Sequence, residues 1–287
     1  HLAAQLDPLQ PEPDPTAWPE LDPATYGLDR TQVAGELARL RRTWCAGIGF
    51  DTAHIHDHTR RHWLQAAAGD PTFAASSDAD RLAALALVAG AEAFEAFMRA
   101  RLPAEKTFGL SGIEGYLVVV EMLLAEAAAG GVQRVVIGGM HRGRLNFMAN
   151  VAGQSPTELL AALKGEGVLP PDLEVSSDVA YHLGHEGSRV IAGRDLKISV
   201  VPHPSHLEVV SPLALGRCRA LQRRAGERRQ VRALLLHTDA SFAGQGIAAE
   251  TLQLSGLPEF SVGGTVHVVA NNQIGFTTGP EAARTSR

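Results

Sequence analysis

The 287-residue sequence contains only two cysteines, which excludes a disulfide scaffold and is typical of a reducing compartment. It has no excess of basic residues: 26 Lys and Arg stand against 31 Asp and Glu, and the net charge of −5 argues against a nucleic-acid-binding protein. No apolar run approaches the roughly 20 residues that a membrane helix needs, and the first residues show no secretory signal pattern. We therefore expect neither a nucleic-acid nor a membrane partner.

What is present, 45% hydrophobic and 20% charged residues, is the composition of a chain that buries a core. Residues 1–30 hold six of the 16 prolines, and they predict an extended arm because proline fixes φ and lacks a backbone donor. Apolar residues then recur at helical spacing from Arg30 to Arg101, with no clear strand. We predict an extended arm and helical segment over residues 1–105.

Beyond residue 105 the pattern alternates between helices and strands. It predicts a helix over Gly112–Ala129 and then strands at Arg134–Ile137, Lys197–Val201, Val231–His237 and Thr265–Ala270. Strands that alternate with helices form a mostly parallel sheet with helices on both faces. We therefore predict an α/β domain over residues 106–287, with ligands bound just beyond the carboxyl ends of its strands.

Polar residues follow the first predicted strand. His141, Arg142 and Arg144 precede a predicted helix, and both guanidinium groups and helix N-terminal N–H groups favour oxyanions. The turn is therefore a candidate anion site, and a solvated basic turn is the alternative. A second polar segment, which contains Ser205 and His206, follows the next strand in the same way.

Oxygen donors follow the last two predicted strands. Asp239 ends one strand and Asn272 follows the next, 33 residues later. Carboxylate and amide oxygens are ligands that Mg²⁺ accepts, and the alternative is a strand-end Asp and an Asn turn that never meet. Gly244–Ala249 fits G-x-G-x-x-A, but a nicotinamide site needs an acidic residue where Asn271–Gln273 stand.

The Asp-to-Asn spacing resembles the thiamin-diphosphate signature, and the surrounding segments resemble one family. Five blocks stand in that family's order: HRGRLN at His141–Asn146, DVAYHLG at Asp178–Gly184, PSHLEVVSP at Pro204–Pro212, GQG at Gly244–Gly246 and NNQIGFTT at Asn271–Thr278. They resemble the decarboxylating component of 2-oxoglutarate dehydrogenase. The resemblance implies a thiamin-diphosphate-binding fold that is incomplete here, because the family's second half is missing.

The resemblance also implies a set of site residues. Mg²⁺ would be held by Asp239, Asn272 and the backbone carbonyl of Ile274. Thiamin diphosphate would be lined by Arg142, Ser205, Leu207, Asp239, Ala240, Ser241 and Asn272. The catalytic residues at the reacting end would be His141, His182 and His206, since imidazoles near neutral pH bind carboxylates and move protons.

Three positions depart from the family's pattern. Thr238 stands where the family has Gly, His203 replaces an Asn, and Ala180 replaces a Lys. A Cβ at residue 238 would crowd the diphosphate if the turn required a positive φ.

The activity implied by the resemblance is oxidative decarboxylation of 2-oxoglutarate, with succinyl transfer to the lipoyl group of a partner acyltransferase, in the tricarboxylic acid cycle. We expect a homodimer at full length, in the bacterial cytoplasm or the mitochondrial matrix, and no activity from this chain alone. The alternatives are a 2-oxoadipate enzyme of the same family, which Tyr181 beside His182 disfavours, and a non-catalytic cofactor-binding fragment. His54, His56, His58 and His62 form a further cluster, which we interpret as surface histidines rather than a metal tract.

Overall fold

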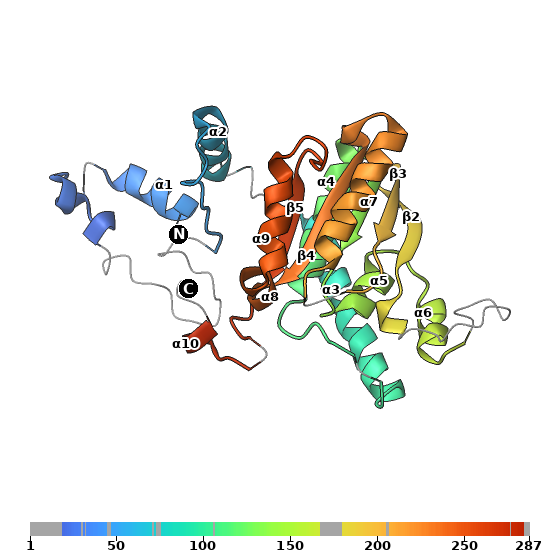
Figure 1. Cartoon of the computed structure of the whole chain (residues 1–287). Helices are drawn as coiled ribbons and strands as arrows, with labels where there is room; N and C mark the ends of the chain where they lie inside the picture. The colour runs from blue at the N-terminus through green and yellow to red at the C-terminus, as the bar shows by residue number, and fades with distance from the viewer. Residues whose placement is uncertain are drawn as a thin grey trace. The chain divides into compact units, whose positions relative to one another are not determined.

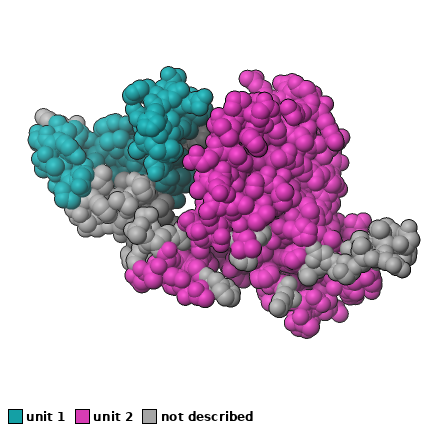
Figure 2. All heavy atoms as spheres, viewed as in Figure 1, with its two compact units in different colours: residues 1–81 teal, residues 82–287 magenta. Residues whose placement is uncertain are grey.

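The computed structural model describes residues 19–29, 31, 33–44, 47–70, 72, 76–105, 107–166, 180–204, 207–275 and 277–283. The chain forms two compact units, residues 1–81 and 82–287 (Figure 2). Among the described residues, no helix has both the length and the apolar character needed to cross a membrane.

The described part of the first unit is helical. Its elements are η2 (Pro19–Leu21), η3 (Pro23–Tyr26), α1 (Ala34–Trp44) and α2 (His58–Gly69). The predicted extended arm is wrong for residues 19–26. There Asp22 accepts a hydrogen bond from the N–H of Ala24, and Gly27 ends the turn at φ 70°, so local caps convert a proline-rich stretch into 3₁₀ helix. Residues 1–18 of the predicted arm lie outside the described residues.

Helix α3 (Asp78–Arg101) crosses the boundary between the units, and most of it packs with the second. Ala91 and Met98 are buried, and the Glu95 carboxylate accepts a hydrogen bond from the N–H of Leu110 at 2.6 Å. Helices α1, α2 and α3 confirm the predicted helical segment. The boundary predicted at residue 105 would place α3 in the N-terminal helical segment, whereas most of α3 belongs to the second compact unit. The assignment of cofactor binding to residues 106–287 stays a prediction.

The second unit is built on a five-stranded sheet. Its strands are β1 (Arg134–Gly138), β2 (His185–Ile191), β3 (Arg194–Val200), β4 (Val231–Thr238) and β5 (Thr265–Ala270), in the spatial order β2-β3-β1-β4-β5. Strands β3, β1, β4 and β5 run parallel, and β2 pairs antiparallel with β3. The predicted mostly parallel sheet is confirmed, and so are its four predicted strands to within a few residues.

Both faces of the sheet are covered by helices (Figure 1). On one face Val135 and Ile137 of β1 pack in the same core as residues of α4 (Gly115–Ala129). On the other face Val136 packs with Ala214 and Cys218 of α7 (Val210–Ala225). Successive side chains of a strand point to opposite faces, so a strand buried on both faces has the continuous apolar sequence seen in β1 and β4.

Shorter helices connect these layers. They are α5 (Arg144–Asn150), α6 (Pro156–Leu163), η4 (Ala180–His182), η5 (Arg228–Gln230), α8 (Asp239–Gly244), α9 (Gly246–Gln253), η6 (Leu254–Gly256) and α10 (Pro280–Ala283). Helix α5 follows the carboxyl end of β1, and α8 follows that of β4. The polar residues that the sequence predicts as site residues therefore lie at one edge of the sheet.

Candidate functional site

Four strands end at the same edge of the sheet. Because β1, β3, β4 and β5 are parallel, the segments that follow them all leave the sheet there. Strand β2 runs the other way, and its first residue, His185, pairs with Val200 at the end of β3, so η4 just before it reaches the same edge. Every predicted site residue that the structure describes therefore lies on a segment at this edge.

Asp239 and Asn272 meet at this edge. Asp239 Oδ1 accepts a hydrogen bond from the backbone N–H of Asn272 at 3.3 Å, and the Asp239 residue is only 3% exposed. Asn272 Oδ1 accepts a hydrogen bond from the N–H of Ile274 at 3.1 Å, across Gln273 with a φ of 62°. The alternative in which the strand-end Asp and the Asn turn never meet is wrong.

The chemistry of this donor set fits a hard divalent cation. A buried carboxylate and an exposed amide stand together, and ligand phosphates and water commonly complete the coordination of Mg²⁺. No group of three or more His, Cys, Asp or Glu side chains suited to a metal ion occurs among the described residues. An ion at this edge would therefore depend on amide, backbone and ligand oxygens beside the Asp239 carboxylate.

The turn after β4 tolerates threonine in place of glycine. Thr238 has φ −100° and ψ 146°, an extended conformation that any residue adopts, so its Cβ introduces no backbone strain. Its Oγ1 lies 2.9 Å from Ser241 Oγ. Ala240 and Ser241 are half-buried at the start of α8.

The G-x-G match lies between two helices. Gly244 ends α8 and Gly246 begins α9, whereas the dinucleotide fingerprint needs its glycine turn directly between a strand and a helix. Nothing lies within 4 Å of the position a Cβ would take on either glycine. The geometry therefore gives no support to the nicotinamide alternative.

His141 and His182, two of the predicted catalytic residues, are linked through Tyr181. The Tyr181 hydroxyl donates a hydrogen bond to the backbone carbonyl of His141, and its side chain is buried. The ring of Phe108 packs edge-on against the rings of His141 and Tyr181, with centroid distances of 4.7 Å and 5.3 Å. The His182 ring lies 5.6 Å from that of His203. The two histidine segments are thus fixed relative to each other.

Arg144 has a structural role that the sequence did not reveal. It is 3% exposed and donates hydrogen bonds to the carbonyls of Leu183 at 2.7 Å and Val201 at 2.9 Å. Burial lowers the pKa of its guanidinium to about 10. Arg144 therefore connects the segment after η4 and the end of β3 to the turn after β1. This leaves Arg142, which is half-buried, as the arginine of that turn available to an anion.

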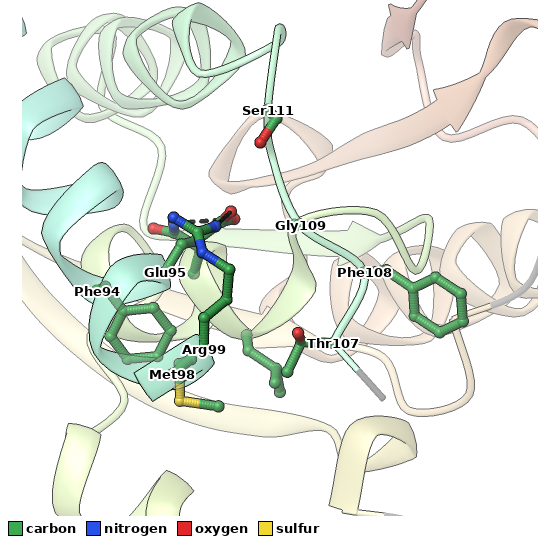
Figure 3. A pocket seen from close by; sticks show the side chains of 11 residues that line it. Phe94, Glu95, Met98, Arg99, Thr107, Phe108, Gly109 and Ser111 are labelled. Atoms are coloured by element: carbon green, nitrogen blue, oxygen red, sulfur yellow. Dashed lines mark hydrogen bonds and ion pairs between the residues drawn. The ribbon is translucent and has the colours of Figure 1, made fainter. Parts of the chain in front are cut away.

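A cavity of about 240 Å³ lies beside this turn, between α3 and the segment 107–111. Figure 3 shows Glu95 and Arg99 of α3 on one side of the segment and the ring of Phe108 on the other. The N–H of Gly143 donates a hydrogen bond to the Phe108 carbonyl at 2.6 Å. The cavity wall is therefore attached to the turn that carries His141.

The remaining candidate residues are those after β3 and the histidine cluster near the N-terminus. Ser205 and His206 lie outside the described residues, and Leu207 beside them is half exposed. His54, His56, His58 and His62 are all exposed, in a turn and along α2 rather than on a strand, as expected for surface histidines.

We expect replacement of Gly143 by Ala to lower the free energy of unfolding by about 1–3 kcal/mol, because a Cβ there overpacks the core. Gly143 has φ 65°, and its Cβ would lie 2.5 Å from Cγ of the buried Leu110. Urea unfolding measures the change. Gly216→Ala is the control, since nothing lies near its Cβ position within α7 and alanine there is expected to stabilise. Equal stability of the Gly143 variant and the wild type would show that this packing is wrong.

The fold and the site define an α/β protein with a buried carboxylate and an amide paired at the carboxyl edge of a mostly parallel sheet. The family model described as dehydrogenase E1 component matches residues 93–287, more than half of the chain. The chain therefore belongs to the dehydrogenase E1 component family.

Individual relatives agree with this assignment. The chain is similar to the 2-oxoglutarate dehydrogenase E1 component of Brucella ovis, with 37% identity over 315 residues. The proteins of the same name from Brucella canis and Brucella abortus show the same identity. In each case the match covers 100% of this chain and 31% of the relative. The chain thus spans about a third of the length of these relatives.

Proposed function

We propose that the protein, at its natural length, carries out the oxidative decarboxylation of 2-oxoglutarate and passes the succinyl group to the lipoyl group of a partner acyltransferase. The observation that carries this proposal is the hydrogen bond from the backbone N–H of Asn272 to the Asp239 carboxylate, which brings two residues 33 positions apart together at the sheet edge. The names of the relatives at 37% identity support 2-oxoglutarate as the substrate. The step belongs to the tricarboxylic acid cycle.

Thiamin diphosphate and Mg²⁺ are the proposed cofactors, and the residues present fit them. Asp239, Asn272 and the backbone carbonyl of Ile274 would hold the ion, which offsets the charge of the diphosphate. Arg142, Ser205, Leu207, Ala240 and Ser241 would line the cofactor, which supplies the electron sink that decarboxylation of a 2-oxo acid requires.

Three histidines are proposed to act on the substrate. His141, His182 and His206 would bind its carboxylates and hold or move a proton at its carbonyl oxygen, because imidazole titrates near neutral pH. The link from Tyr181 to the His141 carbonyl supports a shared role for the first two, since it fixes the distance between their segments. Tyr181, which precedes His182 in the sequence, is buried against Phe108, and we propose that it limits the room for a longer substrate.

The proposal is tested by the release of labelled carbon dioxide from 2-oxoglutarate labelled at carbon 1, with Mg²⁺, thiamin diphosphate and an artificial electron acceptor. We expect kcat/KM for 2-oxoglutarate to exceed that for 2-oxoadipate by roughly 10- to 200-fold, the usual discrimination for one methylene. A preference for 2-oxoadipate would assign the protein to the alternative branch.

Two further proposals concern the whole protein. We expect a homodimer that works with a lipoyl-bearing acyltransferase, in the bacterial cytoplasm or the mitochondrial matrix. We expect residues 1–287 by themselves to show no sustained turnover in the same assay, because they span only 31% of the length of the relatives. Turnover by a pure preparation of these residues would contradict this expectation.

A further inference from the structure

A buried chain of hydrogen bonds runs just behind the carboxyl edge of the sheet. Glu208 Oε2 accepts a hydrogen bond from Ser211 Oγ at 2.9 Å and lies 2.7 Å from His237 Nδ1. His237 Nε2 lies 2.9 Å from His267 Nδ1. The ring of Phe242 packs against both imidazoles, with centroid distances of 4.4 and 5.6 Å. We call these four polar residues, Ser211, Glu208, His237 and His267, the Glu–His chain.

The Glu–His chain carries features that cost stability. Glu208 is 2% exposed and His237 is 1% exposed, and a buried carboxylate is tolerated only when its oxygens are well partnered. Glu208 also has a φ of 62°, which is uncommon for a residue with a side chain. Strained and buried polar groups of this kind persist where the surrounding structure fixes them, and they cluster at functional sites.

The Glu–His chain lies next to segments that carry proposed cofactor residues. Glu208 directly follows Leu207, and His237 lies on β4 two residues before Asp239. His267 lies on β5, and Asn272 follows the end of that strand. Burial lowers the pKa of the His267 imidazole and so favours its neutral form, which has one donor and one acceptor nitrogen. The Glu–His chain thus joins three of the four segments that carry the proposed cofactor residues; the fourth is the turn after β1 with Arg142.

We propose that the Glu–His chain is a positioning device for the thiamin diphosphate and Mg²⁺ site. It holds the segment before α7 against β4 and β5, so that Leu207, Asp239 and Asn272 keep fixed relative positions before any ligand binds. Glu208, His237 and His267 are positioning residues: each acts through the residues that follow or precede it in the sequence, which carry the proposed cofactor contacts. This inference rests on the proposed function.

The first test is Glu208→Gln in the protein at its natural length. Glutamine keeps the size of the side chain but loses the charge that holds Ser211 and His237. We expect the Kd for Mg²⁺, titrated by calorimetry with saturating thiamin diphosphate, to rise about 10- to 100-fold, the equivalent of one hydrogen bond to a charged group. This readout is binding and does not depend on turnover.

A matched control separates positioning from general stability. Gln222 is equally buried near the other end of α7, where its amide donates to the carbonyls of Val231 and Val262 at the opposite edge of the sheet. We expect Gln222→Met to lower the melting temperature and to leave the Kd for Mg²⁺ unchanged. Equal weakening of Mg²⁺ binding by Gln222→Met and Glu208→Gln would overturn the proposal, because general loss of stability would then explain both.

A second variant keeps the proposal testable if Glu208→Gln does not fold. His267→Phe removes only the last hydrogen bond of the Glu–His chain, and we expect it to raise the Kd for Mg²⁺ by about 2- to 10-fold, the equivalent of one hydrogen bond. If the wild type binds thiamin diphosphate with Mg²⁺ and the folded variants bind equally well, the positioning role is wrong. If the wild type shows no Mg²⁺-dependent binding, the proposed function itself fails.

Discussion

Replacing Asp239 by Asn is expected to weaken Mg²⁺-dependent binding of thiamin diphosphate by about 2–5 kcal/mol, roughly 30- to 4000-fold in Kd. Asp239 is 3% exposed, so a cation beside it interacts with a poorly solvated carboxylate. The substitution keeps the shape of the side chain and its ability to accept from the N–H of Asn272 but removes the charge. Calorimetric titration of the cofactor with and without Mg²⁺ measures the difference.

Asp195→Asn is the control for this result. Asp195 is exposed at the start of β3, away from the carboxyl edge, and the substitution makes the same change of charge and shape. We expect its affinity for thiamin diphosphate to equal that of the wild type. Equal affinities of the Asp239 variant and the wild type would remove Asp239 from the set of proposed ligands.

His182→Ala is expected to lower kcat for 2-oxoglutarate by about 10²- to 10⁴-fold, the usual contribution of one well-placed proton donor or acceptor. The Kd for thiamin diphosphate should stay unchanged, because His182 lies in η4 and the proposed Mg²⁺ ligands follow β4 and β5. Turnover and cofactor titration, measured on the same preparation at its natural length, separate the two effects.

His62→Ala is the matched control for that experiment, since His62 is exposed on α2 in the first unit. It should leave both turnover and cofactor affinity at the wild-type level. A His182 variant with full kcat/KM would show that this histidine takes no part in the reaction, and a variant with weakened cofactor binding would reassign it to the cofactor.

The sheet was predictable because its strands are simple in sequence. Residues of β1 and β4 are buried on both faces, so each strand is a short apolar run that a pattern search finds. Strand β2 was missed because His185–Ile191 mixes polar residues with a glycine, and only its pairing with β3 defines it. The 3₁₀ turns of residues 19–26 were missed because the local caps decide their conformation rather than the proline content.

The candidate site was predictable where strand ends place residues. Asp239 and Asn272 could be expected to meet because parallel strands end at one edge, and their contact confirms it. The interior partners could not be predicted in this way. The sequence around Arg144 predicts a basic turn, but its side chain is buried and donates hydrogen bonds to two backbone carbonyls. Glu208 contacts His237 with its backbone at a positive φ, which the sequence does not predict.

The proposed Mg²⁺ site is tested by a crystal structure of the protein at its natural length with thiamin diphosphate and Mn²⁺, an ion that takes the same oxygen ligands as Mg²⁺. We expect an anomalous difference peak beside the Asp239 carboxylate and the side chain of Asn272, with the diphosphate bound against it. A manganese peak at another place on the chain, with cofactor density beside it, would show that Asp239 and Asn272 do not form the metal site.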